Sequence, residues 1–112
     1  MYKKFYMAEE LISEEVGDGV NRQILGFNEK MMMIKVDFKL NAIGVLHHHF
    51  HTQVTYVLSG IFEVSIDGES KILKGGDCFV VDSGLEHGVV CKQAGSLLDV
   101  FNPYREDFLT KK

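Results

Sequence analysis

Four of the five histidines in the chain lie between His47 and His51. Side chains alternate between the two faces of an extended segment, so His47 and His49 project to the same side. Two neutral imidazoles that converge on one point are a common part of a metal site. Gln53 follows His49 by four residues, and its amide oxygen can supply a third ligand. The residue types and their spacing therefore predict a metal centre at this segment.

The fifth histidine, His87, follows a turn that contains glycine and precedes another run of strand-forming residues. It could complete the ligand set from the opposite wall of a barrel. His48 points to the face opposite its two neighbours and is expected to be exposed or structural. The chain is expected to bend just before the next strand, which places His51 at the rim of the site. A ligand or an inert side chain are the alternatives for His51.

A carboxylate also falls on the inner face of a later strand. Leu97, Asp99 and Phe101 are two residues apart and share one face of that strand. An acidic group that faces a barrel interior costs free energy unless it has a partner or a chemical task. Asp99 is therefore a candidate site residue, with exposure to solvent or pairing with Arg105 as the alternatives.

The elements that must position these residues read as short strands. Apolar and polar residues alternate, or β-branched residues cluster, in runs separated by turns, at 34–40, 54–58, 62–66, 71–74, 79–81, 88–91 and 97–101. Asp67-Gly68 is typical of a hairpin turn. No stretch of helical length shows a helical stripe, although residues 104–109 could form a short helix. The pattern predicts an all-β domain, either a barrel or a sandwich.

Length and composition narrow the classes further. A chain of 112 residues is typical of a single domain, and its net charge of −4 offers no basic surface for nucleic acid. No apolar run approaches the length of a membrane span, so we expect no membrane partner and a cytoplasmic protein. Cys78 and Cys91 lie in apolar runs and are expected to be reduced and buried.

Two segments resemble the two motifs of the cupin family: His47-x-His49-x3-Gln53-x6-Gly60 and Gly76-x5-Asp82-Ser83-Gly84-x2-His87. The resemblance implies a single-domain cupin over residues 1–112, a small β-barrel of jelly-roll type with its core at residues 31–101. It implies a divalent ion (nickel, zinc, manganese, iron or cobalt) bound by His47, His49, Gln53 and His87. Asp82 and Cys91 replace the usual proline and asparagine, and Gln53 replaces the usual glutamate. A neutral ligand set favours a Lewis acid.

The segment Asp99-x-Phe101-x-Pro103-x-Arg105-Glu106-Asp107-Phe108 resembles the ending of the pectin-degradation cupins of the KdgF family. That resemblance implies ring opening of 4,5-unsaturated monouronates to 4-deoxy-5-keto-uronate, and a homodimer. Asp99 would be a general base, Phe101 an apolar wall or an ordinary core aromatic, and Arg105 a fork for the carboxylate of the sugar acid. A dioxygenase, a sugar isomerase and a non-catalytic sugar- or metal-binding module are the alternatives.

Overall fold

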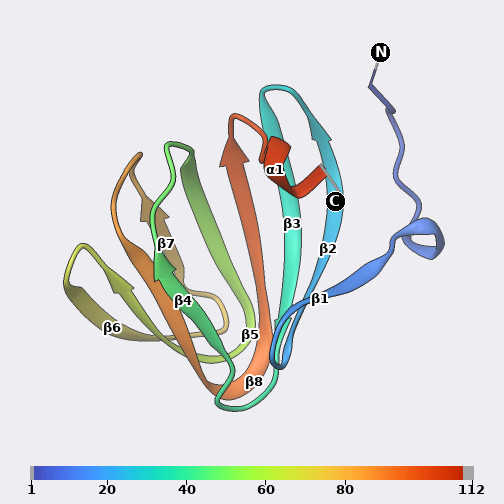
Figure 1. Ribbon diagram of the computed structural model, residues 1–112. Helices are drawn as coiled ribbons and strands as arrows, with labels where there is room; N and C mark the ends of the chain where they lie inside the picture. Colours follow the sequence, from blue (N-terminus) through green and yellow to red (C-terminus); the bar gives the residue numbers. More distant parts are fainter. Residues whose placement is uncertain (1, 110–112) are drawn as a thin grey trace.

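Antiparallel strands make up most of the computed structural model, which describes residues 2–109 (Figure 1). The strands are β1 (Ser13–Gly17), β2 (Val20–Asn28), β3 (Met31–Phe38), β4 (Ile43–His47), β5 (Thr52–Ile66), β6 (Glu69–Lys74), β7 (Cys78–Val81) and β8 (His87–Asn102). The helices are η1 (Ala8–Glu10), a turn of 3-10 helix, and α1 (Glu106–Leu109), which confirms a short helix within the predicted residues 104–109. None of the helices within residues 2–109 is long and apolar enough to cross a membrane.

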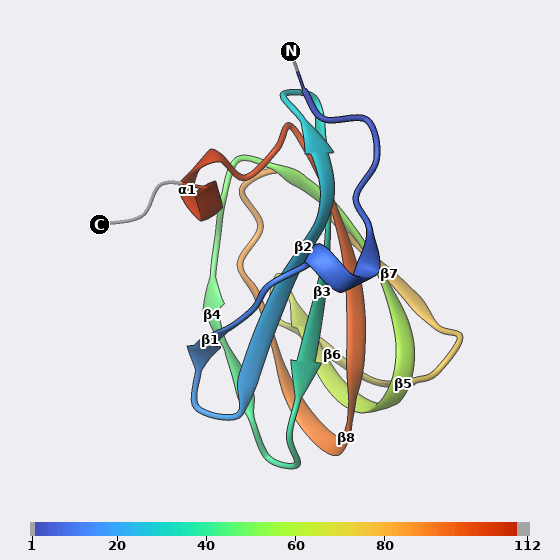
Figure 2. The ribbon, with the colours of Figure 1, turned by 90° about the vertical axis from the view of Figure 1, so that its right-hand side faces the viewer.

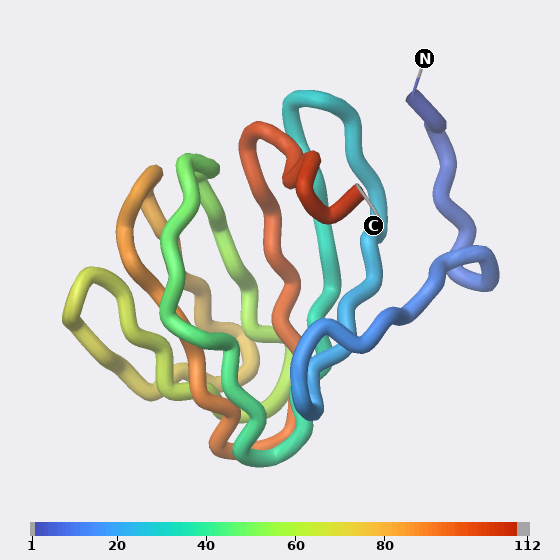
Figure 3. The backbone as a smooth tube through the Cα atoms, viewed as in Figure 1, coloured from blue at the N-terminus to red at the C-terminus, as the bar shows by residue number. Residues whose placement is uncertain are grey.

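Two long strands, β5 and β8, connect the two walls of the barrel. Residues 52–57 of β5 pair with residues 97–102 of β8, whereas residues 61–66 of β5 pair with residues 87–93 of β8. The first pairing belongs to a wall that continues through β3, β2 and β1 and through β7, and the second belongs to a wall with β4 and β6. Both strands bend as they pass from one wall to the other (Figure 3). The sequence predicted four separate runs here, and the structure joins them into two strands.

The bend depends on glycine at the point where β5 and β8 cross. Gly60 has a φ of 86°, a left-handed conformation, and a Cβ at this position would lie 2.6 Å from the carbonyl oxygen of Gln93. Gly95 on β8 faces Ser59 and Gly60 just as closely. A side chain at either position would push the two backbones apart. The Gly60 of the first histidine motif is therefore a structural requirement of the crossing.

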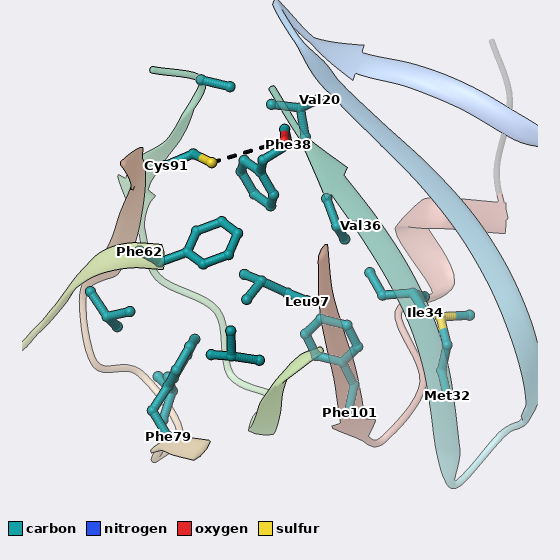
Figure 4. Close-up of a cluster of buried hydrophobic side chains, with 14 residues drawn as sticks. Val20, Met32, Ile34, Val36, Phe38, Phe62, Phe79, Cys91, Leu97 and Phe101 are labelled. Carbon is teal, nitrogen blue, oxygen red and sulfur yellow. Dashed lines mark hydrogen bonds between the residues drawn. The ribbon is translucent and has the colours of Figure 1, made fainter. Parts of the chain in front are cut away.

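The core fills the space between the walls (Figure 4). Ile34, Val36 and Phe38 of β3 are buried as their alternation predicts, but Leu40 lies beyond the end of β3 and is 60% exposed. The packing centres on Phe62, which is fully buried and meets Phe38 edge to face at a centroid distance of 5.2 Å. Most of this apolar packing comes from β3, β5 and β8, and β8 begins at His87.

Both cysteines are free, but only one lies in the core. Cys91 is fully buried, and its thiol contacts the carbonyl oxygen of Phe38 (Figure 4). The prediction that Cys78 is buried was wrong, because its side chain is exposed. Cys78 pairs with Tyr56 on β5, and both side chains lie on the outer face of the wall. Apolar neighbours in the sequence did not distinguish the outer face from the core.

The first strands extend the sheet beyond the predicted barrel core of residues 31–101. β1 and β2 precede it, and β2 pairs along β3 in antiparallel register. Figure 2 shows β1 and β2 on the near face, with the N-terminal segment passing outside them. Tyr2 and Tyr104 both pack against the ring of Phe27, at centroid distances of 5.9 and 6.1 Å. This aromatic contact ties the N-terminal segment to the tail that follows β8.

Candidate metal centre

The three predicted histidine ligands meet at one end of the barrel. His47 is the last residue of β4, His87 is the first residue of β8, and these two residues are paired partners. His49 lies in the loop between β4 and β5, at the upper end of Figure 1. The candidate ligand atoms of the three side chains all lie within 4.8 Å of one another. The structure therefore brings together the histidines that their spacing had indicated.

Main-chain carbonyl groups orient all three imidazoles. The Nδ1 atoms of His47, His49 and His87 lie 2.8, 3.0 and 2.9 Å from the carbonyl oxygens of Val45, His51 and Leu85. A carbonyl oxygen only accepts, so each Nδ1 carries the proton and donates it. The lone pair of each neutral ring then lies on Nε2. This is the tautomer that a metal centre needs at all three positions.

Burial favours the neutral form of two of these imidazoles, His87 and His49. It lowers the pKa of His87 to about 4, against the opposing effect of the hydrogen bond to Leu85, and the neighbouring His47 and His49 lower the pKa further. Burial also lowers the pKa of His49. The Nε2 atom of His87 is buried and has no hydrogen-bond partner. A buried lone pair without a donor costs free energy, and a divalent cation would satisfy it. The cluster fits a divalent metal.

Gln53 adds a fourth ligand atom at the same place. Its Oε1 lies 3.0 Å from Nε2 of His49. Because Nδ1 of neutral His49 holds the ring proton, the facing atoms are both lone-pair acceptors, and a cation between them would satisfy both. Two ligands of one ion, each at about 2.1 Å and at right angles, also stand about 3 Å apart. The position of Gln53 therefore suits the fourth ligand that the sequence predicted.

Asp99 lies on the inner face of β8, next to these ligands. It is 8% exposed, so it does not face solvent. Burial raises the pKa of its carboxyl group to about 6, while a hydrogen bond from Thr55 and the charge of Arg105 act in the opposite direction. The Thr55 hydroxyl lies 2.6 Å from Oδ1 of Asp99. The carboxyl group can thus gain or lose a proton near neutral pH.

The tail beyond β8 covers the site with aromatic and cationic side chains. Arg105 is mostly buried, and its guanidinium carbon lies 5.1 Å from the centre of the Phe101 ring and 4.1 Å from that of Phe108. Its Nε and Nη2 atoms hydrogen-bond the carboxylate of Asp107 at 3.1 and 2.9 Å. Phe101 is 2% exposed and belongs to both the core and the wall of the site. The sequence had offered these two roles as alternatives.

The two remaining histidines differ from each other. His48 is exposed, as predicted. The prediction that His51 lies at the rim was wrong, because it is 6% exposed and its Nε2 lies 3.1 Å from the carbonyl oxygen of Tyr104. The ring of Phe50 packs on it at a centroid distance of 4.1 Å. The tail folds back over His51. A local sequence pattern cannot predict this contact, because His51 and Tyr104 are far apart in the chain.

A cavity of about 800 Å³ connects these groups, and its walls include His47, Gln53, His87, Asp99, Phe101 and Arg105. Sequence reasoning missed two polar residues of this region. Arg22 on β2 lines the cavity, with its guanidinium carbon 3.9 Å from the centre of the Phe108 ring, and nothing in its neighbourhood in the sequence marks it. Thr55 could have been found, because it shares strand parity with Gln53.

Comparisons with known proteins identify the family and agree with the fold. The cupin domain family model matches residues 35–101. The pectin degradation protein KdgF of Dickeya dadantii is 43% identical over 109 residues, which are 96% of this chain and 99% of that protein. An RmlC-like cupin from Shewanella frigidimarina has 44% identity and a TM-score of 0.91, over 95% of this chain and 96% of its own. KdgF from Halomonas sp. has 33% identity and a TM-score of 0.88, over 95% and 98%.

Proposed function

The chain belongs to the cupin family and, within it, to the KdgF family, and from this premise we propose that it opens the ring of 4,5-unsaturated monouronates from pectin or alginate. The product would be the linear 4-deoxy-5-keto-uronate. The Dickeya dadantii relative is a pectin degradation protein, which supports the same role here. The observation that carries the proposed reaction is the buried carboxyl group of Asp99, placed in one cavity with ligands that fit a divalent metal.

Asp99 would move the proton that the reaction requires. The substrate is a cyclic hemiacetal whose ring oxygen also belongs to an enol ether. The Asp99 carboxylate accepts the proton of the C1 hydroxyl group, the C1 carbonyl forms, and the bond from C1 to the ring oxygen breaks to leave an enolate. The enolate takes the same proton back at C4, C5 becomes a ketone, and Asp99 is again a carboxylate. A pKa near 6 suits a group that both accepts and donates a proton at neutral pH.

The other residues would bind and stabilise. A divalent ion held by the three histidines, with Gln53 as a further ligand, would supply positive charge that stabilises the enolate oxygen. Arg105 presents its cation to the cavity, and because one edge of its guanidinium binds Asp107, the substrate carboxylate would meet its remaining N–H groups. Phe101 would limit the width of the pocket beside the sugar ring.

An assay with an unsaturated monouronate tests the proposal. The metal-loaded protein is mixed with 4,5-unsaturated galacturonate, and the loss of the absorbance of the conjugated alkene is followed. We expect a rate well above the spontaneous one, and elemental analysis of the same sample identifies the metal. The Asp99→Asn variant should lose at least about 100-fold in kcat, the range of general acid–base catalysis, without losing metal.

A matched control separates the role of Asp99 from a general effect of charge. Asp82→Asn makes the same change at an exposed aspartate outside the cavity lining and should retain the rate of the unmodified protein. A rate for the unmodified protein no higher than the spontaneous one would exclude the proposed reaction. Full activity of Asp99→Asn would instead show that another group moves the proton.

We also propose a homodimer and a cytoplasmic location. The outer face of the wall formed by β3, β8, β5 and β7 carries apolar side chains that are about half exposed, among them Met33, Val54, Tyr56, Leu58 and Val80. A contiguous apolar face of this kind is typical of an interface, and a second copy of the chain is the partner that needs no other component. The two free cysteines support a reducing compartment.

A further inference from the structure

Thr55 lies between the proposed metal ligand and the proposed base. It is fully buried in β5 and is the paired partner of Asp99 on β8. Its hydroxyl oxygen is 2.6 Å from Oδ1 of Asp99 and 2.8 Å from Nε2 of Gln53. Gln53 Nε2 itself lies 3.4 Å from the same Asp99 oxygen. The three side chains therefore form one buried polar network.

The hydrogen count of this network fixes its direction. A hydroxyl group has one proton, and the ionised carboxylate of Asp99 only accepts, so Thr55 donates to Asp99 whenever Asp99 is ionised. The lone pairs of the hydroxyl oxygen then face Gln53, where only an amide NH2 group can be the partner. The NH2 end of the Gln53 amide is thereby held on the Thr55 side. Its oxygen must point the other way, toward Nε2 of His49 at 3.0 Å.

We propose that Thr55 is a positioning residue that selects which end of the Gln53 amide faces the metal. An amide is nearly symmetric in shape, and rotation by half a turn would present an NH2 group, which cannot bind a cation. The carboxylate that most cupins have at this position has two equivalent oxygens and needs no such selection. Thr55 is thus the residue that makes glutamine usable as a ligand in this site. The proposal rests on the metal site of the proposed function and not on the turnover of uronate.

Substitutions at Thr55 test the assignment through metal affinity. Thr55→Val keeps the shape and removes the hydroxyl group, and Thr55→Ser keeps the hydroxyl group and removes a methyl group. Binding of Co²⁺ is measured by competition with a chelator, and the visible absorption of bound Co²⁺ reports its ligands. We expect Thr55→Val to bind Co²⁺ about 10- to 100-fold more weakly, as for other residues that orient a ligand, with an altered spectrum. Thr55→Ser should restore both the affinity and the spectrum.

The same strand offers a matched control. Thr52 is an exposed threonine three residues earlier in β5, and Thr52→Val should leave Co²⁺ affinity unchanged. Normal affinity and spectrum for Thr55→Val would overturn the proposal. So would a Thr55→Ser variant as weak as Thr55→Val, because the methyl group and not the hydroxyl group would then be responsible.

One measurement needs no variant and covers the case in which Thr55→Val does not fold. The side-chain NH2 group of Gln53 is observed by 15N NMR in the unmodified protein, where we expect its hydrogens to exchange slowly with solvent. Exchange as fast as that of an exposed glutamine would overturn the proposal. Co²⁺ binding does not involve uronate, so loss of Co²⁺ affinity in Thr55→Val supports the role of Thr55 even if the unmodified protein does not turn over uronate.

Discussion

The two halves of β5 place polar side chains on opposite faces of the sheet. In the first half, residues 52–58, the buried positions include Gln53 and Thr55. The outward side chains that alternate with the buried ones from residue 54 onward are apolar and exposed. In the second half, residues 61–66, the order is reversed, with Phe62 fully buried and charged or hydroxyl side chains facing out. One strand thus lines the candidate metal centre before its bend and an ordinary core after it.

The difference shows that alternation identifies a strand without identifying its inner face. A site that binds a cation and moves a proton needs polar groups inside, and those groups have to be satisfied by one another. The apolar side chains of the same half then lie on the outer face, where another protein surface has to shield them from water. An apolar exterior is therefore the counterpart of a polar interior in this strand.

Removal of the largest side chain of the second half should have the largest effect. Phe62→Ala leaves a cavity in the core and should lower the free energy of unfolding by about 3–5 kcal/mol. Urea unfolding of the metal-free protein measures this loss. Phe62→Leu keeps most of the volume and should cost less than about 1.5 kcal/mol. A small loss for Phe62→Ala would mean that the second half is not the stabilising half.

Acid should change the stability of the metal-free protein through the polar interior that the first half of β5 lines. Unfolded His87 binds a proton below pH 6.5 and the folded residue only near pH 4, so acid weakens the metal-free fold. Folded Asp99 binds a proton near pH 6 and the unfolded residue only near pH 3.8, so acid strengthens the fold through this group. The two effects oppose each other between about pH 4 and 6.

Asp99→Asn removes the stabilising effect and leaves the weakening one. Between pH 6.5 and 4.5 this variant should therefore lose about 2 kcal/mol more of its unfolding free energy than the unmodified protein. Urea unfolding of both metal-free proteins at several pH values measures the difference. Parallel pH profiles would show that Asp99 is already ionised to the same extent in the folded and unfolded chains.

A charge on the outer face of the first half should weaken the proposed dimer. Tyr56 is 42% exposed on that face, and Tyr56→Lys would bring two like charges into an apolar contact. The dimer dissociation constant should rise at least about tenfold, measured by analytical ultracentrifugation. Ile72→Lys places the same charge on the exposed face of β6, beside the second half, and should leave the constant unchanged.

The outer face of the second half should be the least sensitive part of β5. Glu63 forms an ion pair with Lys92 at 3.7 Å, and both side chains are nearly half exposed. Solvent screens such a pair, so Glu63→Ala should change the free energy of unfolding by no more than about 0.5 kcal/mol. Exposed ion pairs contribute at most about 1 kcal/mol. A larger loss for Glu63→Ala would show that this face is packed against another surface.

Local spacing predicted part of the histidine cluster but not the network around it. His47 and His49 were placed together because strand parity acts within a few residues, whereas His87 was added as the remaining histidine that follows a turn and could face them across a barrel. Thr55 was read as part of a β-branched strand, since its polar role depends on Asp99, its partner on β8. His51 was misplaced for the same reason, because a tail that lies far away in the sequence covers it.

Alternation and β-branched runs predicted β3 and the segments that form β5, β6, β7 and β8, but they did not predict β1, β2, β4 or the joins between runs. Two runs become β5 because Gly60 lets the chain bend without leaving the sheet, and this depends on how closely β8 approaches. Leu40 broke the predicted alternation because β3 ends at Phe38 and the chain turns at Asn41, which has a φ of 70°. The ends and bends of these strands depend on contacts between segments that are distant in the chain, and a single sequence does not reveal those contacts.

The carbonyl groups that orient the three imidazoles belong to the main chain, and every amino acid carries one. Replacement of Val45 or Leu85 by another residue leaves the acceptor in place, so the metal site tolerates a change of side chain at both positions. Each acceptor lies two residues from its histidine along the chain. The orientation of these imidazoles therefore depends on the path of the main chain beside each histidine, and drift in sequence can proceed around the site as long as that path is kept.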